Sequence, residues 1–242
     1  MSLPMRFWIF VVNLLCLPLH LIKAVGLYEP YKRIFPMYVN RITMGYNKKM
    51  QDKKRELFRS LSEFNKHGGP LTILEIGCGS GANFEFYPAG CKVICTDPNP
   101  HFQKYLEKNI AKNEHISCDR FVVLSGEDMG SVEGESVDAV VCTLVLCSVT
   151  SIALTLREAR RVLRPGGAFF FIEHVVADPS TWSYFFQHVL QPFWYYFGDG
   201  CEVTRETWKY VEAAGFSDLK LRHVEAPLIF IIKPHIIGYA VK

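Results

Sequence analysis

Short apolar runs alternate with amphipathic segments along most of the chain. Apolar runs of four to six residues bounded by glycine, proline or polar residues are typical of buried parallel strands. Segments with apolar residues three or four positions apart are typical of helices that cover a sheet. This pattern predicts strands at residues 73–76, 93–97, 121–124, 136–142, 168–173, 219–224 and 236–241, and helices at residues 101–113, 152–163 and 204–214.

The order of these elements predicts the fold class. Strands that alternate with helices form an α/β protein with a doubly wound, mostly parallel sheet, here of seven strands. A ligand then binds at the carboxyl ends of the central strands. The chain has 242 residues, of which 49% are hydrophobic, which is enough for a single core of this kind. Residues 71–242 are assigned to this domain.

An apolar segment precedes the domain. Residues 7–22 are interrupted by only three positions that are polar or proline. As a helix this segment would span about 24 Å, less than the roughly 30 Å of bilayer hydrocarbon. The small residues Ala24 and Gly26 leave a cleaved signal peptide as an alternative. We expect a retained membrane anchor over residues 1–28, because the basic flank that follows favours the cytoplasmic side.

Residues 29–70 are expected to form a basic and aromatic lead-in between the anchor and the domain. Tyrosine and phenylalanine mixed with lysine and arginine suit the headgroup region of a membrane. A solvated helix explains the charges at residues 48–55 equally well. The basic positions in and beside this lead-in are Lys23, Lys32, Arg33, Arg41, Lys48, Lys49, Lys53, Lys54 and Arg55.

Charge and cysteine content narrow the classes of function. The formal net charge of +3 is too small to indicate nucleic-acid binding on its own. The eight cysteines form no C-x-x-C pair and no disulfide framework, so we expect reduced thiols, a domain that faces the cytosol, and no metal site. The cysteines are Cys16, Cys78, Cys91, Cys95, Cys118, Cys142, Cys147 and Cys201.

The turn after the first predicted strand carries the strongest chemical signal. Glu75 is followed by three alternate glycines, Gly77, Gly79 and Gly81. Glycines at these positions let the backbone turn sharply and approach a ligand closely. Asp97 ends the second predicted strand, where a carboxylate accepts hydrogen bonds from a ribose diol. These residues predict a site for a nucleotide cofactor.

Two later segments extend the predicted cofactor site. Asp128 follows the third predicted strand, where an acidic side chain would read the exocyclic amine of adenine. The loop after the fourth strand, which contains Leu144, would run beneath the cofactor. The sequence Pro165-Gly166-Gly167 then ends a helix and leads into the fifth strand.

The spacing G-x-G-x-G after Glu75 resembles the first motif of S-adenosylmethionine-dependent methyltransferases of the Rossmann-like class, class I. Further segments resemble the microsomal thiol S-methyltransferases, the methyltransferase-like seven family, and most of all its A-type members. They include Asp97-Pro98-Asn99-Pro100, Glu173-His174-Val175 and Asp199-Gly200-Cys201. The resemblance implies S-adenosylmethionine as cofactor and small alkyl thiols, hydrogen sulfide included, as substrates. It also implies a protein on the cytosolic face of the endoplasmic reticulum membrane and on lipid droplets.

Methylation of a thiol needs the thiolate, which is a small fraction of a free alkyl thiol at neutral pH. His174 and Asp199 are the candidates for the group that assists ionisation, and so for catalytic residues. A structural histidine and an ordinary Asp-Gly turn are the alternatives. Cys147 either lines the acceptor pocket or packs in the core. The aromatic residues 182–197 form either a lid over that pocket or part of the core.

Two other functions compete with thiol methylation. RNA methylation at adenine N6 usually brings an Asp/Asn-Pro-Pro-aromatic tetrad after the fourth strand, where this chain has Thr143-Leu144-Val145-Leu146. A non-catalytic membrane or lipid-droplet scaffold would have little need of the glycine turn and Asp97. Cofactor binding separates these alternatives.

Overall fold

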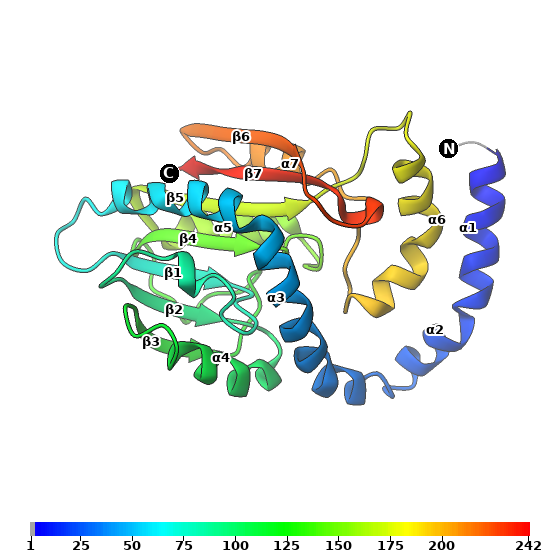
Figure 1. Cartoon of the computed structure of the whole chain (residues 1–242), viewed down its shortest axis with the longest axis horizontal. Helices are drawn as coiled ribbons and strands as arrows, with labels where there is room; N and C mark the ends of the chain where they lie inside the picture. The colour runs from blue at the N-terminus through cyan, green and yellow to red at the C-terminus, as the bar shows by residue number, and fades with distance from the viewer. Residues whose placement is uncertain (1–2) are drawn as a thin grey trace.

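The computed structural model describes residues 3–242. At its centre lies one sheet of seven strands in the order β3-β2-β1-β4-β5-β7-β6 (Figure 1). Strands β1 to β5 are parallel, whereas β7 is antiparallel to both β5 and β6. The predicted seven-stranded, mostly parallel sheet is therefore confirmed. The strands are β1 (Thr72–Ile76), β2 (Lys92–Thr96), β3 (Ser117–Val122), β4 (Val137–Thr143), β5 (Leu163–His174), β6 (Asp218–Glu225) and β7 (Pro234–Val241).

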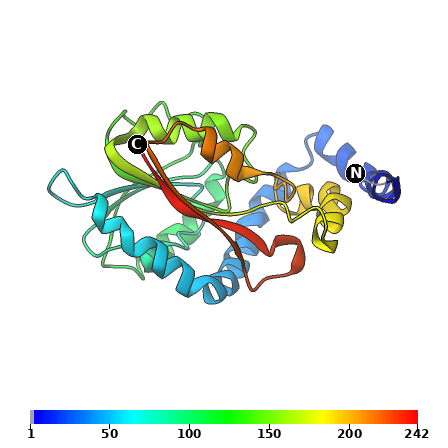
Figure 2. The ribbon, with the colours of Figure 1, turned by 90° about the horizontal axis from the view of Figure 1, so that it is seen from above.

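Helices cover both faces of the sheet (Figure 2). One face packs against α3, the short helix η1 and α4, and the other packs against α5 and α7. Two further helices precede α3, and α6 lies beyond the end of β5. The helices are α1 (Leu3–Leu15), α2 (Leu17–Ala24), α3 (Glu29–Arg59), η1 (Ser60–Phe64), η2 (Phe84–Phe86), η3 (Pro100–Phe102), α4 (Gln103–Ile110), α5 (Ile152–Val162), α6 (Trp182–Phe197), α7 (Thr207–Ala213) and η4 (Phe230–Ile232).

The central strands are buried on both faces. In β5, Phe169 and Phe171 face the core under α5 and α7, while Phe170 faces the core under α3. A continuous apolar run of this kind is what a parallel strand between two helical layers requires. The packing holds the carboxyl ends of β1, β2, β4 and β5 along one edge of the sheet.

Several predicted elements have other bounds in the structure. The fifth strand was expected from residue 168, but β5 begins at Leu163, so Pro165-Gly166-Gly167, predicted to end a helix, lies within the strand. The third strand was expected at residues 121–124 but β3 ends at Val122, because it is an edge strand that pairs only with β2 and leaves Val123 exposed. The helix predicted to start at Thr204 begins at Thr207, and its N-cap residue Glu206 makes no side-chain cap. The carbonyl of Arg205 accepts a hydrogen bond from the backbone N–H of Val176, which keeps this part of the chain outside the helix.

The N-terminal apolar segment forms two helices, α1 and α2, with a bend of 50° between them. In residues 3–242 no single helix has the length and apolar character to cross a membrane, although α1 and α2 together meet these two criteria as a bent pair. Helix α1 lies beside α6 (Figures 1 and 2). The predicted boundaries at residues 28 and 70 fall just before α3 and just before β1.

Candidate active site

The glycine turn after β1 is shaped by contacts that exclude a Cβ atom. Gly77 has a φ of 60°, and a Cβ there would lie 2.5 Å from Cγ2 of Val145. Gly81 has a φ of 76°, and its Cβ would lie 2.5 Å from the ring of Phe84. Gly79 between them has a φ of 53°. The turn therefore requires glycine for backbone conformation and for space.

Asp97 joins the end of β2 to this turn. Its Oδ2 accepts a hydrogen bond from the backbone N–H of Gly79 at 3.0 Å, and its Oδ1 accepts one from the N–H of Asn99 at 2.8 Å. Burial raises the pKa of Asp97 to about 6; the two N–H groups oppose this rise and the charge of Asp199 adds to it. A carboxylate has about four lone pairs, so Asp97 retains acceptor capacity for a ribose diol.

Glu75 lies beneath the turn, and each of its oxygens accepts a hydrogen bond from the protein. Asn83 donates to its Oε1 at 2.7 Å, and the Tyr87 hydroxyl donates to its Oε2 at 2.8 Å. Glu75 thus holds the segment after the glycines in place.

Lys54 belongs to this site, so its predicted place in the exposed basic flank was wrong. Its side chain is buried, with Nζ 2.6 Å from Oδ1 of Asn47 and 2.7 Å from Oδ1 of Asn83. The signal was its spacing: Lys54 lies four residues after Met50 and four before Phe58, on the apolar stripe of α3.

Burial shifts the pKa values of both charged groups in this network. It lowers the pKa of Lys54 to about 8, against the attraction of Glu75 and Glu85. It raises the pKa of Glu75 to about 7, against the hydrogen bonds from Tyr87 and Asn83 and the charge of Lys54. Because Asn83 bridges the two, the cation on α3 and the acid on β1 are coupled.

Asp128 and Leu144 lie on the loops that follow β3 and β4. Asp128 is exposed, and its Oδ1 accepts a hydrogen bond from the N–H of Gly130 at 3.3 Å. Its loop reaches the end of β1, because a Cβ on Gly126 would lie 2.6 Å from Cγ2 of Ile76. Leu144 has a φ of 57°, a left-handed conformation that is costly for leucine and typical of functional loops.

Three side chains from separate segments meet at the ends of β4 and β5. His174 Nε2 lies 3.1 Å from Cys201 Sγ, and Cys201 Sγ lies 3.4 Å from Cys147 Sγ. All three are buried, with exposed fractions of 4%, 8% and 2%. Cys201 was not among the predicted site residues, because no sequence spacing links these three positions. We call this group the sulfur–imidazole cluster.

Two polar atoms beside the sulfur–imidazole cluster are buried without a hydrogen-bond partner among the described residues. They are Nδ1 of His174 and Oε2 of Glu173. The other oxygen of Glu173 accepts a hydrogen bond from the N–H of Val145 at 3.1 Å. Burial raises the pKa of Glu173 to about 8. Unpartnered buried polar atoms are rare in folded proteins, and they point to a ligand or water at this place.

Asp199 precedes Cys201 by two residues and lies near the start of α3. It has a φ of 48° and is half-buried near Tyr28 and Lys32 at the start of α3. Burial raises its pKa, while the charge of Lys32 opposes the rise. The negative charge of Asp199 also raises the pKa of Asp97. Of the two predicted catalytic residues, His174 thus belongs to the sulfur–imidazole cluster. Asp199 lies close enough to Asp97, the predicted ribose-binding residue, to affect its pKa.

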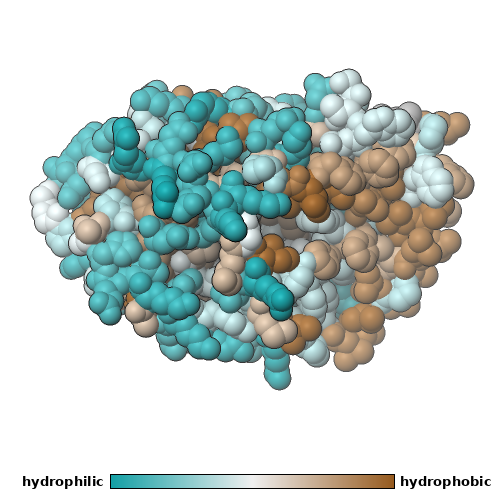
Figure 3. All heavy atoms as spheres, viewed as in Figure 1, coloured by the Kyte–Doolittle hydropathy of each residue, from teal (hydrophilic) through white to brown (hydrophobic). Residues whose placement is uncertain are grey.

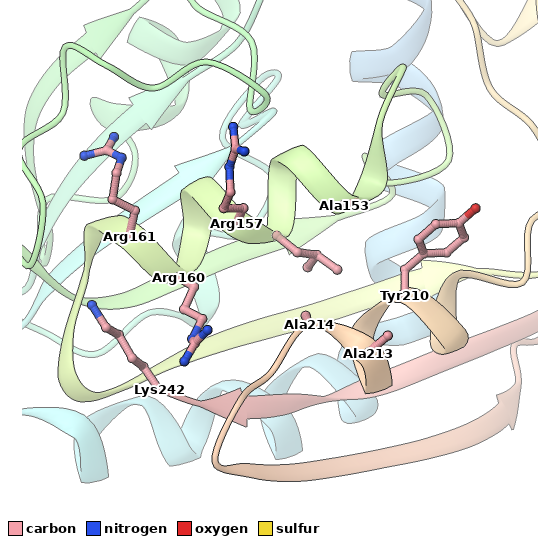
Figure 4. A pocket seen from close by; sticks show the side chains of 9 residues that line it. Ala153, Arg157, Arg160, Arg161, Tyr210, Ala213, Ala214 and Lys242 are labelled. Atoms are coloured by element: carbon pink, nitrogen blue, oxygen red, sulfur yellow. The ribbon is translucent and has the colours of Figure 1, made fainter.

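A groove elsewhere on the surface shares no residue with this site. It lies between α5 and α7, where Arg160 and Lys242 extend toward it from opposite sides (Figure 4). Two of its other charged residues, Arg157 and Arg161, extend away from α5 in the same view. None of the predicted site residues lines this groove.

The sheet order, the glycine turn and Asp97 together define a class I methyltransferase. Residues 74–171 match the family model described as a methyltransferase domain. The structure is similar to that of a geranyl diphosphate methyltransferase in complex with SAM, with a TM-score of 0.58 and 16% identity over 78% of this chain and 84% of that chain. That similarity concerns the fold.

Two curated human proteins are much more similar in sequence. Thiol S-methyltransferase TMT1A is 58% identical over 212 residues, which are 87% of this chain and 87% of that protein. Thiol S-methyltransferase TMT1B is 50% identical over 234 residues, which are 96% of each. The chain belongs to the thiol S-methyltransferase family that these two proteins represent.

Proposed function

We propose that this protein transfers the methyl group of S-adenosylmethionine to small alkyl thiols, hydrogen sulfide among them. One observation carries the proposal: in a chain 58% identical to a thiol S-methyltransferase, the glycine turn, Asp97 and the buried sulfur–imidazole cluster lie along one edge of the sheet. The test is a radiolabelled methyl-transfer screen over thiol, phenol, amine and RNA acceptors. Transfer to RNA alone, or to none of them, would contradict it.

The residues present fit the cofactor. The turn at Gly77, Gly79 and Gly81 presents backbone without side chains, and Asp97 has lone pairs free for a ribose diol. When bound, S-adenosylmethionine supplies an electrophilic methyl group on a sulfonium. The protein's own residues then have to position the acceptor and favour its thiolate.

The acceptor proton is the main chemical problem left to the protein. A thiol with a pKa near 8.5 is only a few per cent ionised at neutral pH. Support for assistance by His174 comes from its unpartnered Nδ1, which is free to accept a proton or a hydrogen bond. Asp199 is the second candidate, because burial raises its pKa and so makes it a stronger base.

Replacing the assisting residue is expected to slow alkyl thiols far more than acidic aromatic thiols. An aromatic thiol is already ionised at neutral pH, so only the alkyl thiol needs help. We expect about 10²- to 10⁴-fold loss with alkyl thiols in His174→Ala or Asp199→Ala. The wild-type rate with alkyl thiols should rise toward pH 8.5 and that with aromatic thiols should be flatter. Initial rates from pH 6 to pH 9 are the measurement.

His223→Ala is the matched control, because His223 is exposed on β6, away from the site. It should leave both pH profiles unchanged. Should His174→Ala and Asp199→Ala slow both thiol types equally, or neither, positioning alone would account for the reaction and the assisting role would be refuted.

The structure offers little support for RNA as the substrate. Asp97-Pro98-Asn99-Pro100 follows β2, whereas the tetrad of amino methyltransferases would follow β4, where Thr143-Leu144-Val145-Leu146 stands. A scaffold role has less support still, because the cofactor turn and its supporting hydrogen bonds are intact.

We also propose that the protein binds membranes through its N-terminal helices, on the cytosolic face of the endoplasmic reticulum and on lipid droplets. An apolar surface covers the end of the molecule formed by α1 and α6 (Figure 3). We call this surface the apolar end. Its exposed side chains include Phe7, Trp8, Phe10, Leu14 and Leu15 of α1, Leu17 and Leu21 of α2, and Trp182, Phe186 and Phe193 of α6.

The aromatic segment predicted as a lid or as core packing is α6. One face of α6 lies against α1, and Trp194 on another face donates a hydrogen bond from its indole N–H to Cys201 Sγ at 3.3 Å. This arrangement supports a segment that closes the site and also meets the membrane, so that lipophilic thiols would enter from the bilayer.

Introducing two negative charges on α1 by substitution is expected to release the protein from membranes. Phe7 and Phe10 are exposed, so Phe7→Glu/Phe10→Glu should leave the fold intact. Burying one phenylalanine contributes about 1.5–3 kcal/mol, and losing two should weaken partitioning by at least about a hundredfold. Sedimentation with liposomes measures this. Val123→Glu, at an exposed apolar residue after β3, is the control and should sediment like the wild type; equal sedimentation of all three proteins would contradict the assignment of the apolar end.

A further inference from the structure

The sulfur–imidazole cluster has the composition of a zinc site. Cys147, His174 and Cys201 each offer one ligand atom, and these three atoms lie within 4.8 Å of one another. Thiolate and imidazole are the ligands that Zn²⁺ prefers, and three protein ligands with one open position are typical of catalytic rather than structural zinc. The absence of a C-x-x-C pair had predicted no metal site, but here the fold joins ligands from three segments.

The distances fit a tetrahedral ion after a small adjustment. With Zn–S near 2.3 Å and Zn–N near 2.0–2.1 Å, tetrahedral ligands lie about 3.8 Å apart for two sulfurs and about 3.6 Å apart for sulfur and nitrogen. The corresponding distances are 3.4 Å between the sulfurs and 3.1 Å between Cys201 Sγ and His174 Nε2. Each ligand would therefore move outward by a few tenths of an ångström.

The loops that carry the two cysteines are already held in place. Trp194 donates its indole N–H to Cys201 Sγ, and Gln191 donates to the Cys201 carbonyl at 3.2 Å. Arg205 donates to the carbonyls of Leu146 and Val149, both at 2.7 Å, and so fixes the loop of Cys147. Hydrogen bonds around the ligands of this kind orient metal sites. An N–H donor to sulfur also favours the thiolate that a metal needs.

We propose that Cys147, His174 and Cys201 bind one Zn²⁺, whose fourth position takes the acceptor thiol. This inference rests on the proposed function and gives His174 the role of ligand instead of free base. Zn²⁺ displaces the protons of both cysteines and of the acceptor, which pass to solvent. The acceptor sulfur then forms a bond to the methyl carbon as the sulfonium C–S bond breaks, and that electron pair stays on the cofactor sulfur. The neutral thioether leaves the zinc.

The test is the metal content of the full-length protein, purified in detergent under reducing conditions. We expect elemental mass spectrometry to find about one zinc ion per chain. Replacement by Co²⁺ should give the sulfur-to-cobalt charge-transfer band and the visible bands of a tetrahedral site. Cys147→Ser and Cys201→Ser should each lower the affinity for Zn²⁺ by more than about a hundredfold, since loss of a supporting residue alone costs about 10- to 100-fold.

Cys118→Ser is the matched control. Cys118 Sγ lies 3.9 Å from Cys95 Sγ, so this pair resembles the proposed one but lies away from His174. The control should keep both the zinc and the cobalt spectrum. Wild-type protein that holds no more zinc than Cys147→Ser, as purified and after incubation with Zn²⁺, would overturn the proposal. Equal loss of zinc in Cys118→Ser would overturn it too.

Activity separates this proposal from the proposed function. Zinc-free wild type should bind S-adenosylmethionine normally, methylate acidic aromatic thiols at the wild-type rate, and methylate alkyl thiols at least about tenfold more slowly. If the zinc-free protein methylates alkyl thiols at the full rate, zinc has no role in the reaction. If zinc-loaded protein binds the cofactor but methylates no thiol, the proposed zinc site is supported and the proposed thiol methylation is refuted.

Discussion

Replacing Lys54 with methionine is expected to lower the free energy of unfolding by about 3 kcal/mol, because removal of one partner from a buried charged network leaves the others uncompensated. Nζ of Lys54 donates to Asn47 and Asn83, and Asn83 in turn donates to Glu75. The substitution keeps most of the side-chain volume, so the loss measures the charge and its hydrogen bonds. Urea unfolding at pH 7.5, between the pKa values of about 7 for Glu75 and about 8 for Lys54, is the measurement.

The loss in Lys54→Met should shrink as the pH falls toward 5. The folded-state pKa of Glu75 is about 7, above its ordinary value of 4.5. The charge of Lys54 lowers this pKa, so in Lys54→Met the pKa rises further, and the cost of the buried Glu75 charge is lost as the pH falls through a value above 7, where the folded state takes up the proton. Glu75→Gln in the Lys54→Met background should restore part of the stability for the same reason.

Lys49→Met is the control for charge and helix position, since Lys49 is exposed on the same helix. It should change the free energy of unfolding by no more than about 0.5 kcal/mol. If Lys54→Met and Lys49→Met have the same stability, or if the two substitutions at Lys54 and Glu75 are additive, the coupling through Asn83 does not exist.

Replacing Asp97 with alanine is expected to weaken S-adenosylmethionine binding by about ten- to a hundredfold. The substitution removes a charged acceptor from the ribose, worth roughly 1.5–3 kcal/mol. It also removes the acceptor for the N–H of Gly79, which helps to hold the glycine turn. Titration calorimetry on the folded variant is the measurement, and unchanged affinity would refute the assignment.

The pH dependence of binding gives a second readout on Asp97. Its pKa in the folded protein is about 6, so below that pH the carboxylate is protonated and wild-type affinity should fall by about tenfold per pH unit. Asp97→Asn should bind weakly without this dependence. Asp119→Ala, at an exposed residue of β3, is the control and should keep the wild-type affinity and pH profile.

The local pattern of residues was sufficient to predict the sheet and the cofactor turn. A strand buried on both faces needs a continuous apolar run, and a backbone that turns beside a ligand needs glycine, so both leave a signal within a few residues of sequence. Gly77 and Asp97 were recognisable for that reason. The predicted bounds of the edge strand β3 were wrong because half of its residues face solvent, so the strand lacks a continuous apolar run.

Burial of a charged side chain and the meeting of distant side chains were decided only by tertiary structure. Lys54 was predicted to lie on a solvated basic face, because composition does not show which lysine is buried. In the fold, Lys54 donates hydrogen bonds to Asn47 and Asn83. Cys147, His174 and Cys201 are separated by at least 27 residues along the chain, and they meet because β4, β5 and the loop after α6 end at one edge of the sheet. Periodicity reports what a segment buries, whereas a site assembled from several segments depends on how those segments pack.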